Sequence, residues 1–127
     1  MERVEGIGGL FIRARDPDAL AAWYETHLGI GASPGAWRQA GGTTIFAPFA
    51  EDNDYFARAK GWMLNLRVRD LDAMIRQLEG AGLSIQTDPA WNSEVGRFAR
   101  IHDPEGNPVE LWEPSEMVRK QEAARGE

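Results

Sequence analysis

The stretch Gly96–Pro114, GRFARIHDPEGNPVELWEP, predicts two antiparallel strands joined by a tight turn. Side chains alternate between two faces on both sides of the turn, as is typical of β-strands. The segment 103–107, DPEGN, supplies the turn, because proline presets φ and glycine and asparagine tolerate positive φ. Glu110 lies in mid-strand, on the face opposite to Val109 and Leu111. Because charged groups are rarely buried without a partner, this face is either exposed to solvent or part of a cavity.

The composition indicates a single soluble, globular domain. The chain has 127 residues, of which 43% are hydrophobic and 27% charged. It has no cysteine, which excludes disulfides, thiolate metal sites and cysteine nucleophiles. The net charge of −6 argues against nucleic-acid binding. No apolar run reaches the length of a membrane span, and no signal peptide is visible, so we expect a cytoplasmic protein that binds no membrane.

The first half of the chain predicts a strand, a helix and a hairpin. Residues 7–14 alternate as a strand does. A helix is expected from Asp16 to about Leu28, because aspartate is a good N-cap and the proline that follows fits the first helical position. Segments 37–40 and 43–48 can pair around two glycines.

A polar linker or mobile loop, 51–60, separates this pattern from its repetition. Residues 62–68 predict a strand, Asp70 caps a second helix that ends near Gly80, and 83–85 predict a short strand. Six residues recur 54 positions later: Leu10, Arg13, Arg15, Asp16, Asp18 and Ala19 return as Leu64, Arg67, Arg69, Asp70, Asp72 and Ala73.

The repeat divides the chain into a module at 5–50, the linker, a module at 61–114 and a charged tail at 115–127. The tail is either a frayed helix or disordered. Strands and helices in this order predict an α+β domain in which each sheet has one face under its helix and one free face. Two free faces that curl toward each other would form a pocket. Its candidate ligand-binding residues are Phe11, Arg13, Thr44, Phe46, Met63, Asn65, Arg67, Phe98, Arg100, Glu110 and Trp112.

Several motifs resemble those of the vicinal oxygen chelate superfamily, which includes glyoxalases, extradiol dioxygenases and bleomycin-resistance proteins. The resemblance covers 5–114 and rests on Arg15-Asp16, Trp23-Tyr24, Leu28-Gly29, Val68-Arg69-Asp70-Leu71-Asp72 and, above all, 103–111, DPEGNPVEL. It implies two βαβββ modules that form a cup-shaped mixed sheet with helices on the outer face, and usually a homodimer. In many members, it also implies a divalent metal held by one residue from each of four strands.

The metal ligands of the superfamily are not retained here. The two positions that correspond to histidine ligands hold Gly9 and Met63, and the ligand position on the last strand of the first module falls at about Thr44. Only Glu110 matches the pattern. Because transition-metal sites usually take three or more imidazole or carboxylate ligands, we expect no metal cofactor.

Two function classes remain open. The first is a metal-free protein that binds a small organic molecule, as bleomycin-resistance proteins do. The second is a lyase, isomerase or dioxygenase of the superfamily, with a metal or with Glu110 or His102 as a base. The arginines and aromatics of the free faces favour a ligand that is partly aromatic and anionic. Alternatively, these arginines are solvated at the rim, and Glu110 only forms a salt bridge with Arg13, Arg67 or Arg100.

Overall fold

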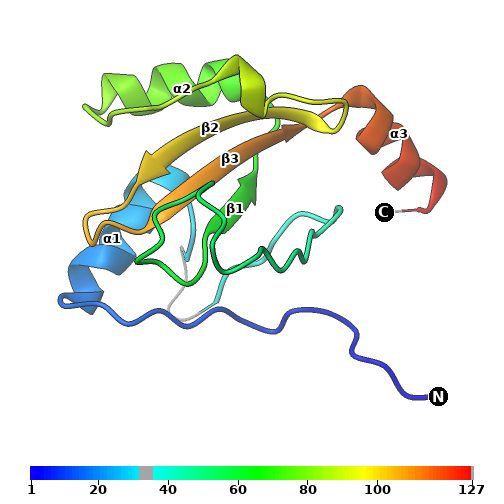
Figure 1. Cartoon of the computed structure of the whole chain (residues 1–127), viewed down its shortest axis with the longest axis horizontal. Coiled ribbons are helices and arrows are strands. Elements are labelled where there is room, and N and C mark those ends of the chain that lie inside the picture. Colours follow the sequence, from blue (N-terminus) through cyan, green and yellow to red (C-terminus); the bar gives the residue numbers. More distant parts are fainter. Residues whose placement is uncertain (32–35, 127) are drawn as a thin grey trace.

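The computed structural model describes residues 1–31 and 36–126, in which helices and a small mixed sheet form the α+β fold that the sequence predicts (Figure 1). In the described part of the chain, no helix is both long enough and apolar enough to cross a membrane. The elements in order are α1 (Pro17–Leu28), β1 (Leu64–Arg67), α2 (Leu71–Gly80), the 3₁₀ helix η1 (Pro89–Trp91), β2 (Gly96–His102), β3 (Pro108–Pro114) and α3 (Glu116–Ala124).

The sheet has the strand order β1-β3-β2. β2 and β3 are antiparallel and are joined by the turn at 103–107, which confirms the predicted hairpin. β1 runs parallel to β3. The register places Glu110 between Asn65 on one side and Arg100 on the other. Three polar side chains from three strands therefore lie side by side on one face.

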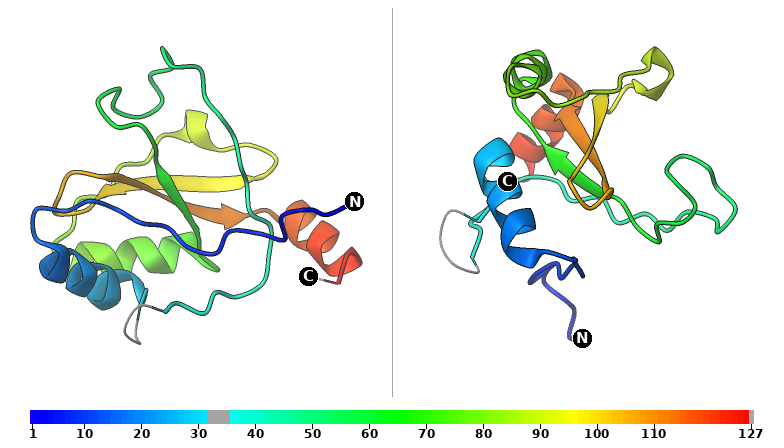
Figure 2. Two further views of the ribbon diagram at one scale, coloured as in Figure 1. Left: turned by 90° about the horizontal axis from the view of Figure 1, so that it is seen from below. Right: turned by 90° about the vertical axis from the view of Figure 1, so that its left-hand side faces the viewer.

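The opposite face of the sheet forms the core. Val109 and Leu111 are fully buried there, as their position on the strand predicts. Leu20 of α1 and both Leu71 and Leu78 of α2 pack against this face. Figure 2 shows the two helices on one side of the sheet and the loop that precedes β1 on the other. Burying these aliphatic side chains contributes about 1.5–3 kcal/mol each.

Both predicted helices form with the expected caps. Asp16 accepts a hydrogen bond from the backbone of Ala19 at 3.1 Å, and Asp70 accepts one from Ala73 at 3.0 Å. Gly29 ends α1 with φ at 70°, a conformation that glycine adopts without steric cost. The charged tail also forms a helix, α3, for which Ser115 is the N-cap.

The turn at 103–107 ties the two halves of the chain together. The Glu105 carboxylate accepts hydrogen bonds from the backbone N–H groups of Arg15 at 3.0 Å and Asp16 at 3.1 Å. These donors stand at the start of α1, where a negative charge is favourable. They hold the pKa of Glu105 below its usual value, and the Arg15 side chain adds to this.

The strands expected in the first module do not form in the single chain. Residues 7–14 and 37–48 have no strand assignment, and Ile7, Leu10 and Phe11 are exposed. Part of this region is held by side-chain contacts and not by a ladder of backbone hydrogen bonds. The Arg67 side chain donates to the carbonyls of Ala40 at 2.8 Å and Gly41 at 3.0 Å. The alternating pattern predicts a strand, but a strand also needs a partner edge, and these segments are not paired with one. The predicted strand at 83–85 is likewise reduced to one bridge between Gln86 and Arg100.

Candidate functional site

Glu110 is the centre of a polar cluster on the face of the sheet that α1 and α2 leave free. Its side chain is buried, with the residue only 5% exposed. One carboxylate oxygen accepts a hydrogen bond from Asn65 Nδ2 at 2.7 Å, and the other accepts one from the hydroxyl of Tyr55. Both partners are neutral hydrogen-bond donors.

Tyr55 reaches this face from the loop that precedes β1. Its ring stands edge to face with Trp91 of η1, at a centroid distance of 6.2 Å, and with Phe49 at 6.0 Å. Burial, followed by the hydrogen bond to the negative Glu110, raises the pKa of Tyr55 to about 12, an effect that the positive Arg100 partly offsets. The phenol is therefore a stable hydrogen-bond donor at neutral pH.

Arg100 lies across the ladder from Glu110 and is only 6% exposed. Its guanidinium carbon lies 4.9 Å from the ring centroid of Tyr55 and 5.0 Å from that of Trp91. Among the residues that the structure describes, its Nε and Nη2 atoms are buried without a hydrogen-bond partner. Leaving buried donors of this kind unpaired is costly, so these two nitrogens favour contact with an oxygen acceptor.

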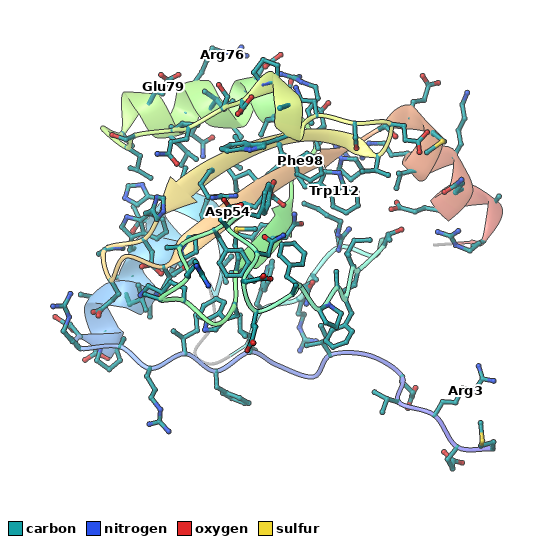
Figure 3. All side chains as sticks on the ribbon, viewed as in Figure 1. Arg3, Asp54, Arg76, Glu79, Phe98 and Trp112 are labelled. Atoms are coloured by element: carbon teal, nitrogen blue, oxygen red, sulfur yellow. The ribbon has the colours of Figure 1, made fainter. Side chains whose placement is uncertain are left out.

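Aromatic side chains continue from the polar cluster along β2 and β3: Phe98, which is half-buried, and Trp112, which is only 3% exposed. The rings of Phe98 and Trp112 are stacked, with centroids 6.2 Å apart and an interplanar angle of 4° (Figure 3). The indole nitrogen of Trp112 donates to the carbonyl of Val95 at 3.0 Å, which fixes the orientation of the ring. The site thus combines flat apolar walls with a few oriented polar groups, as small-molecule sites do.

The structure brings together only part of the predicted ligand-binding set. Asn65, Arg100 and Glu110 form the polar cluster, and Phe98 and Trp112 lie next to it. Arg67 is engaged by carbonyls of the first module, and Met63 is half-buried just before β1. The four residues of the first module are apart from the sheet or exposed: Phe11, Arg13, Thr44 and Phe46.

His102 lies at the end of β2, where it is exposed and pairs in register with Pro108. No described contact joins it to Glu110, so a role of His102 as a base stays a prediction. Tyr55 and Trp91 were not among the predicted site residues. Both are aromatic residues in otherwise polar, loop-like segments, and this was the signal in the sequence that could have revealed them.

The residues of this site do not fit a divalent metal. In the ranges 1–31 and 36–126, no group of three histidine, cysteine, aspartate or glutamate side chains is arranged to hold one. Both oxygens of Glu110 already accept hydrogen bonds, and the buried cation Arg100 lies beside it. A second cation there would meet electrostatic repulsion.

Comparisons with known proteins agree with this architecture. A family model described as a glyoxalase-like domain matches residues 9–112. TnmS3, an antibiotic binding protein from Streptomyces sp. CB03234, has a similar structure, with a TM-score of 0.61 and 21% identity over 91% of this chain and 100% of that chain. A glyoxylase/bleomycin resistance protein/dioxygenase domain from Frankia sp. EAN1pec has a TM-score of 0.53 and 18% identity, over 89% of this chain and 100% of that one.

No curated protein matches the sequence significantly. The two structural neighbours are under 25% identical and therefore bear on the fold alone. The family match covers most of the chain, including the turn at 103–107 and the Glu110 strand. The chain belongs to the glyoxalase-like domain family, within the vicinal oxygen chelate superfamily.

Proposed function

We propose that this protein binds a small, partly aromatic organic molecule over the Glu110 face of its sheet, without a metal. The observation that carries the proposal is that Glu110 and Arg100, which face each other across two strands, are both buried among aromatic side chains. Arg100 supplies donors without a partner in the described chain, and Trp91, Phe98 and Trp112 supply apolar walls. These groups suit orientation and recognition of a ligand more than Lewis-acid chemistry.

The polar group of the ligand follows from Arg100. Its two unpartnered nitrogens call for an oxygen acceptor, and a guanidinium matches a carboxylate best because both are planar and can form two parallel hydrogen bonds. Arg67 is less suited to this role, since its guanidinium already donates to Ala40 and Gly41. The ligand is therefore an aromatic molecule with a carboxylate or a similar anionic oxygen group.

TnmS3 is an antibiotic binding protein, so a protein with this fold can serve in reversible binding. The chain described here shares its fold at 21% identity. A protein of this kind would act by sequestration, which requires affinity and needs no reacting group.

The complete site would take residues from a homodimer. Phe11 and Phe46 are 96% and 87% exposed in the single chain, although the sequence predicts both on pocket-facing strands. Exposed apolar strand segments and the open edge of β1 are liabilities that pairing with a second copy would remove. Such pairing would form the second half of the cup, and a two-fold axis would produce two equivalent pockets.

Isothermal titration calorimetry with 2-naphthoate and 2-naphthamide tests this function. The acid should bind wild-type protein more tightly than the amide by about tenfold, and Arg100→Gln should abolish the difference. Arg97→Gln is the matched control, because Arg97 is exposed on the same strand and is ion-paired with Asp72. Equal affinity for acid and amide would contradict the proposal that the ligand carries an anionic group. Recovery of a chemically altered compound after incubation would show that the protein catalyses a reaction and does not only bind its ligand.

A further inference from the structure

Tyr55 fills the place beside Glu110 that a ligand would need. Its hydroxyl is bound to Glu110, and its ring lies under the guanidinium of Arg100 and against Trp91. Two surface depressions of the molecule lie elsewhere, one against α3 and the other beside Arg15 and Lys60. The polar cluster is thus occupied by a side chain of the protein itself.

The segment that carries Tyr55 is attached to the sheet by few interactions. Residues 50–60 form neither helix nor strand, and their own hydrogen bonds are local turns, such as Asn53 to Ala50 at 2.9 Å and Lys60 to Ala57 at 2.9 Å. In the described chain, the polar contacts of this segment with the rest of the molecule are made by Tyr55, with Glu110 and Arg100, and by Lys60, with Asn107. Few contacts to the body of a protein imply a low cost of local opening.

We propose that Tyr55 is an internal substitute for the ligand, and that the ligand presents a phenolic ring which displaces it. This inference rests on the proposed function and specifies which aromatic compounds the site takes: hydroxyarenes. Binding then requires residues 50–60 to move away from the sheet, so that Tyr55 and the ligand compete for the same position.

The partners of Tyr55 specify a phenol better than other groups. A carboxylate such as Glu110 needs a donor, which a plain arene or an aryl ether lacks. A phenol oxygen donates one hydrogen bond and retains lone pairs that can accept from the unpartnered nitrogens of Arg100. The ring face meets the same guanidinium, an attraction that any electron-rich arene would reproduce. The raised pKa of Tyr55 agrees with this, because the site favours the neutral phenol over the phenolate.

Chemical complementation tests the inference. p-Cresol has the phenol ring of tyrosine, with a methyl group in the place of Cβ, so its ring fits the space that Tyr55→Ala opens. We expect p-cresol to bind Tyr55→Ala at least about tenfold more tightly than wild type, measured by calorimetry. 4-Methylanisole, whose oxygen carries no hydrogen, should bind the variant about tenfold more weakly than p-cresol. Phe56→Ala is the matched control, because Phe56 belongs to the same segment and its ring packs on Phe49.

A second pair of variants distinguishes the effect of losing the Tyr55 hydroxyl from the effect of the space that the missing ring leaves. Tyr55→Phe keeps the ring but releases Glu110, so it should bind p-cresol more tightly than wild type and more weakly than Tyr55→Ala. The double variant Tyr55→Ala/Glu110→Leu should bind p-cresol and 4-methylanisole equally. Equal binding of the two compounds to Tyr55→Ala, or tighter binding to Phe56→Ala, would overturn the inference. The naphthoate titration, repeated on Tyr55→Ala, measures the binding function without competition from Tyr55 and without a hydroxyl on the ligand. Failure of the phenol specificity is therefore distinguishable from failure of the binding function.

Discussion

The hydroxyl of Tyr24 in α1 donates a hydrogen bond to Asp103 Oδ2 at 2.7 Å, although the two residues are 79 positions apart. Both are buried, and Asp103 also accepts from the side chain of Asn107 at 2.8 Å and from two backbone N–H groups of the turn. This bond joins the first helix to the turn at 103–107, beside the Glu105 contact with the start of α1.

Tyr24→Phe should lower the free energy of unfolding by about 1–3 kcal/mol, because it removes a donor from a buried carboxylate. Urea denaturation followed by circular dichroism measures the change. Tyr55→Phe is the matched comparison, since it removes the hydroxyl of the other tyrosine at a half-buried position and should cost less. An unchanged midpoint for Tyr24→Phe would show that the bond contributes nothing to stability.

The two tyrosines should titrate only in strongly alkaline solution while the chain is folded. Burial and Glu110 raise the pKa of Tyr55 to about 12, and burial with Asp103 raises the pKa of Tyr24 further. The unfolded chain loses both protons near pH 10, so it binds fewer protons than the folded chain above that pH. Stability should therefore fall as the pH rises from about 10 toward about 12.

Phenolate absorbance, measured in buffer and in denaturing urea, checks this prediction. The urea curve should rise near pH 10, and the curve in buffer should remain flat there. Tyr55→Phe should remove the transition with the lower pKa in the folded protein. A folded protein that forms a full equivalent of phenolate at pH 10 would contradict the burial of both hydroxyls.

Gly96→Ala should destabilise the fold by about 2–4 kcal/mol, because the site has no space for a methyl group. An added Cβ would lie 2.6 Å from the indole nitrogen of Trp112 and closer still to the carbonyl of Glu113, at a φ of 145°. Gly80→Ala is the control, since nothing lies within 4 Å of its Cβ position and alanine favours helices. Thermal unfolding of the two variants measures the difference, and similar melting temperatures would refute the predicted clash.

The hairpin and both helices were predictable because their signals are local. Asp16, Pro17 and Gly29 define α1 through cap geometry, and the turn at 103–107 defines the register of β2 and β3. The strand at 7–14 was predicted from the same kind of alternation, yet it does not form in the single chain. Alternation shows that a segment can be a strand, whereas its partner edge is a property of the tertiary structure.

The candidate site was predictable to the extent that it lies on strands. Glu110, Asn65 and Arg100 were assigned to one face by their period of two, and the register places them side by side. The position of Tyr55 could not be predicted in the same way, because residues 50–60 show no periodicity that would assign its side chain to one face. Contacts made by irregular segments depend on the tertiary fold, which local pattern does not specify.

Protein purified without added metal should contain no stoichiometric transition metal. The physical reason is the composition of the site: neutral donors occupy both oxygens of Glu110, and Gly9 and Met63 stand where the superfamily has histidines. Elemental analysis by mass spectrometry measures the metal content. One equivalent of tightly bound metal per chain, lost in Glu110→Ala, would contradict the prediction.

Light scattering at tens of micromolar should give a mass about twice the 14.1 kDa of one chain. Phe11→Asp combined with Phe46→Asp should shift the protein toward the monomer, because both exposed rings would be buried in the proposed dimer. Val4→Asp is the control, since Val4 is equally exposed but precedes the first module. A wild-type mass equal to that of one chain would contradict the proposed dimer.

The contacts of α1 with residues 103 and 105 have a consequence for synthesis on the ribosome. The acceptors for Tyr24, Arg15 and Asp16 are translated about 80 to 90 residues after their donors. A nascent chain that has completed α1 therefore lacks these hydrogen bonds until the last hairpin leaves the exit tunnel. The core residues that β2 and β3 contribute around Leu20 and Tyr24 are also absent until then, so α1 reaches its full packing only late in synthesis.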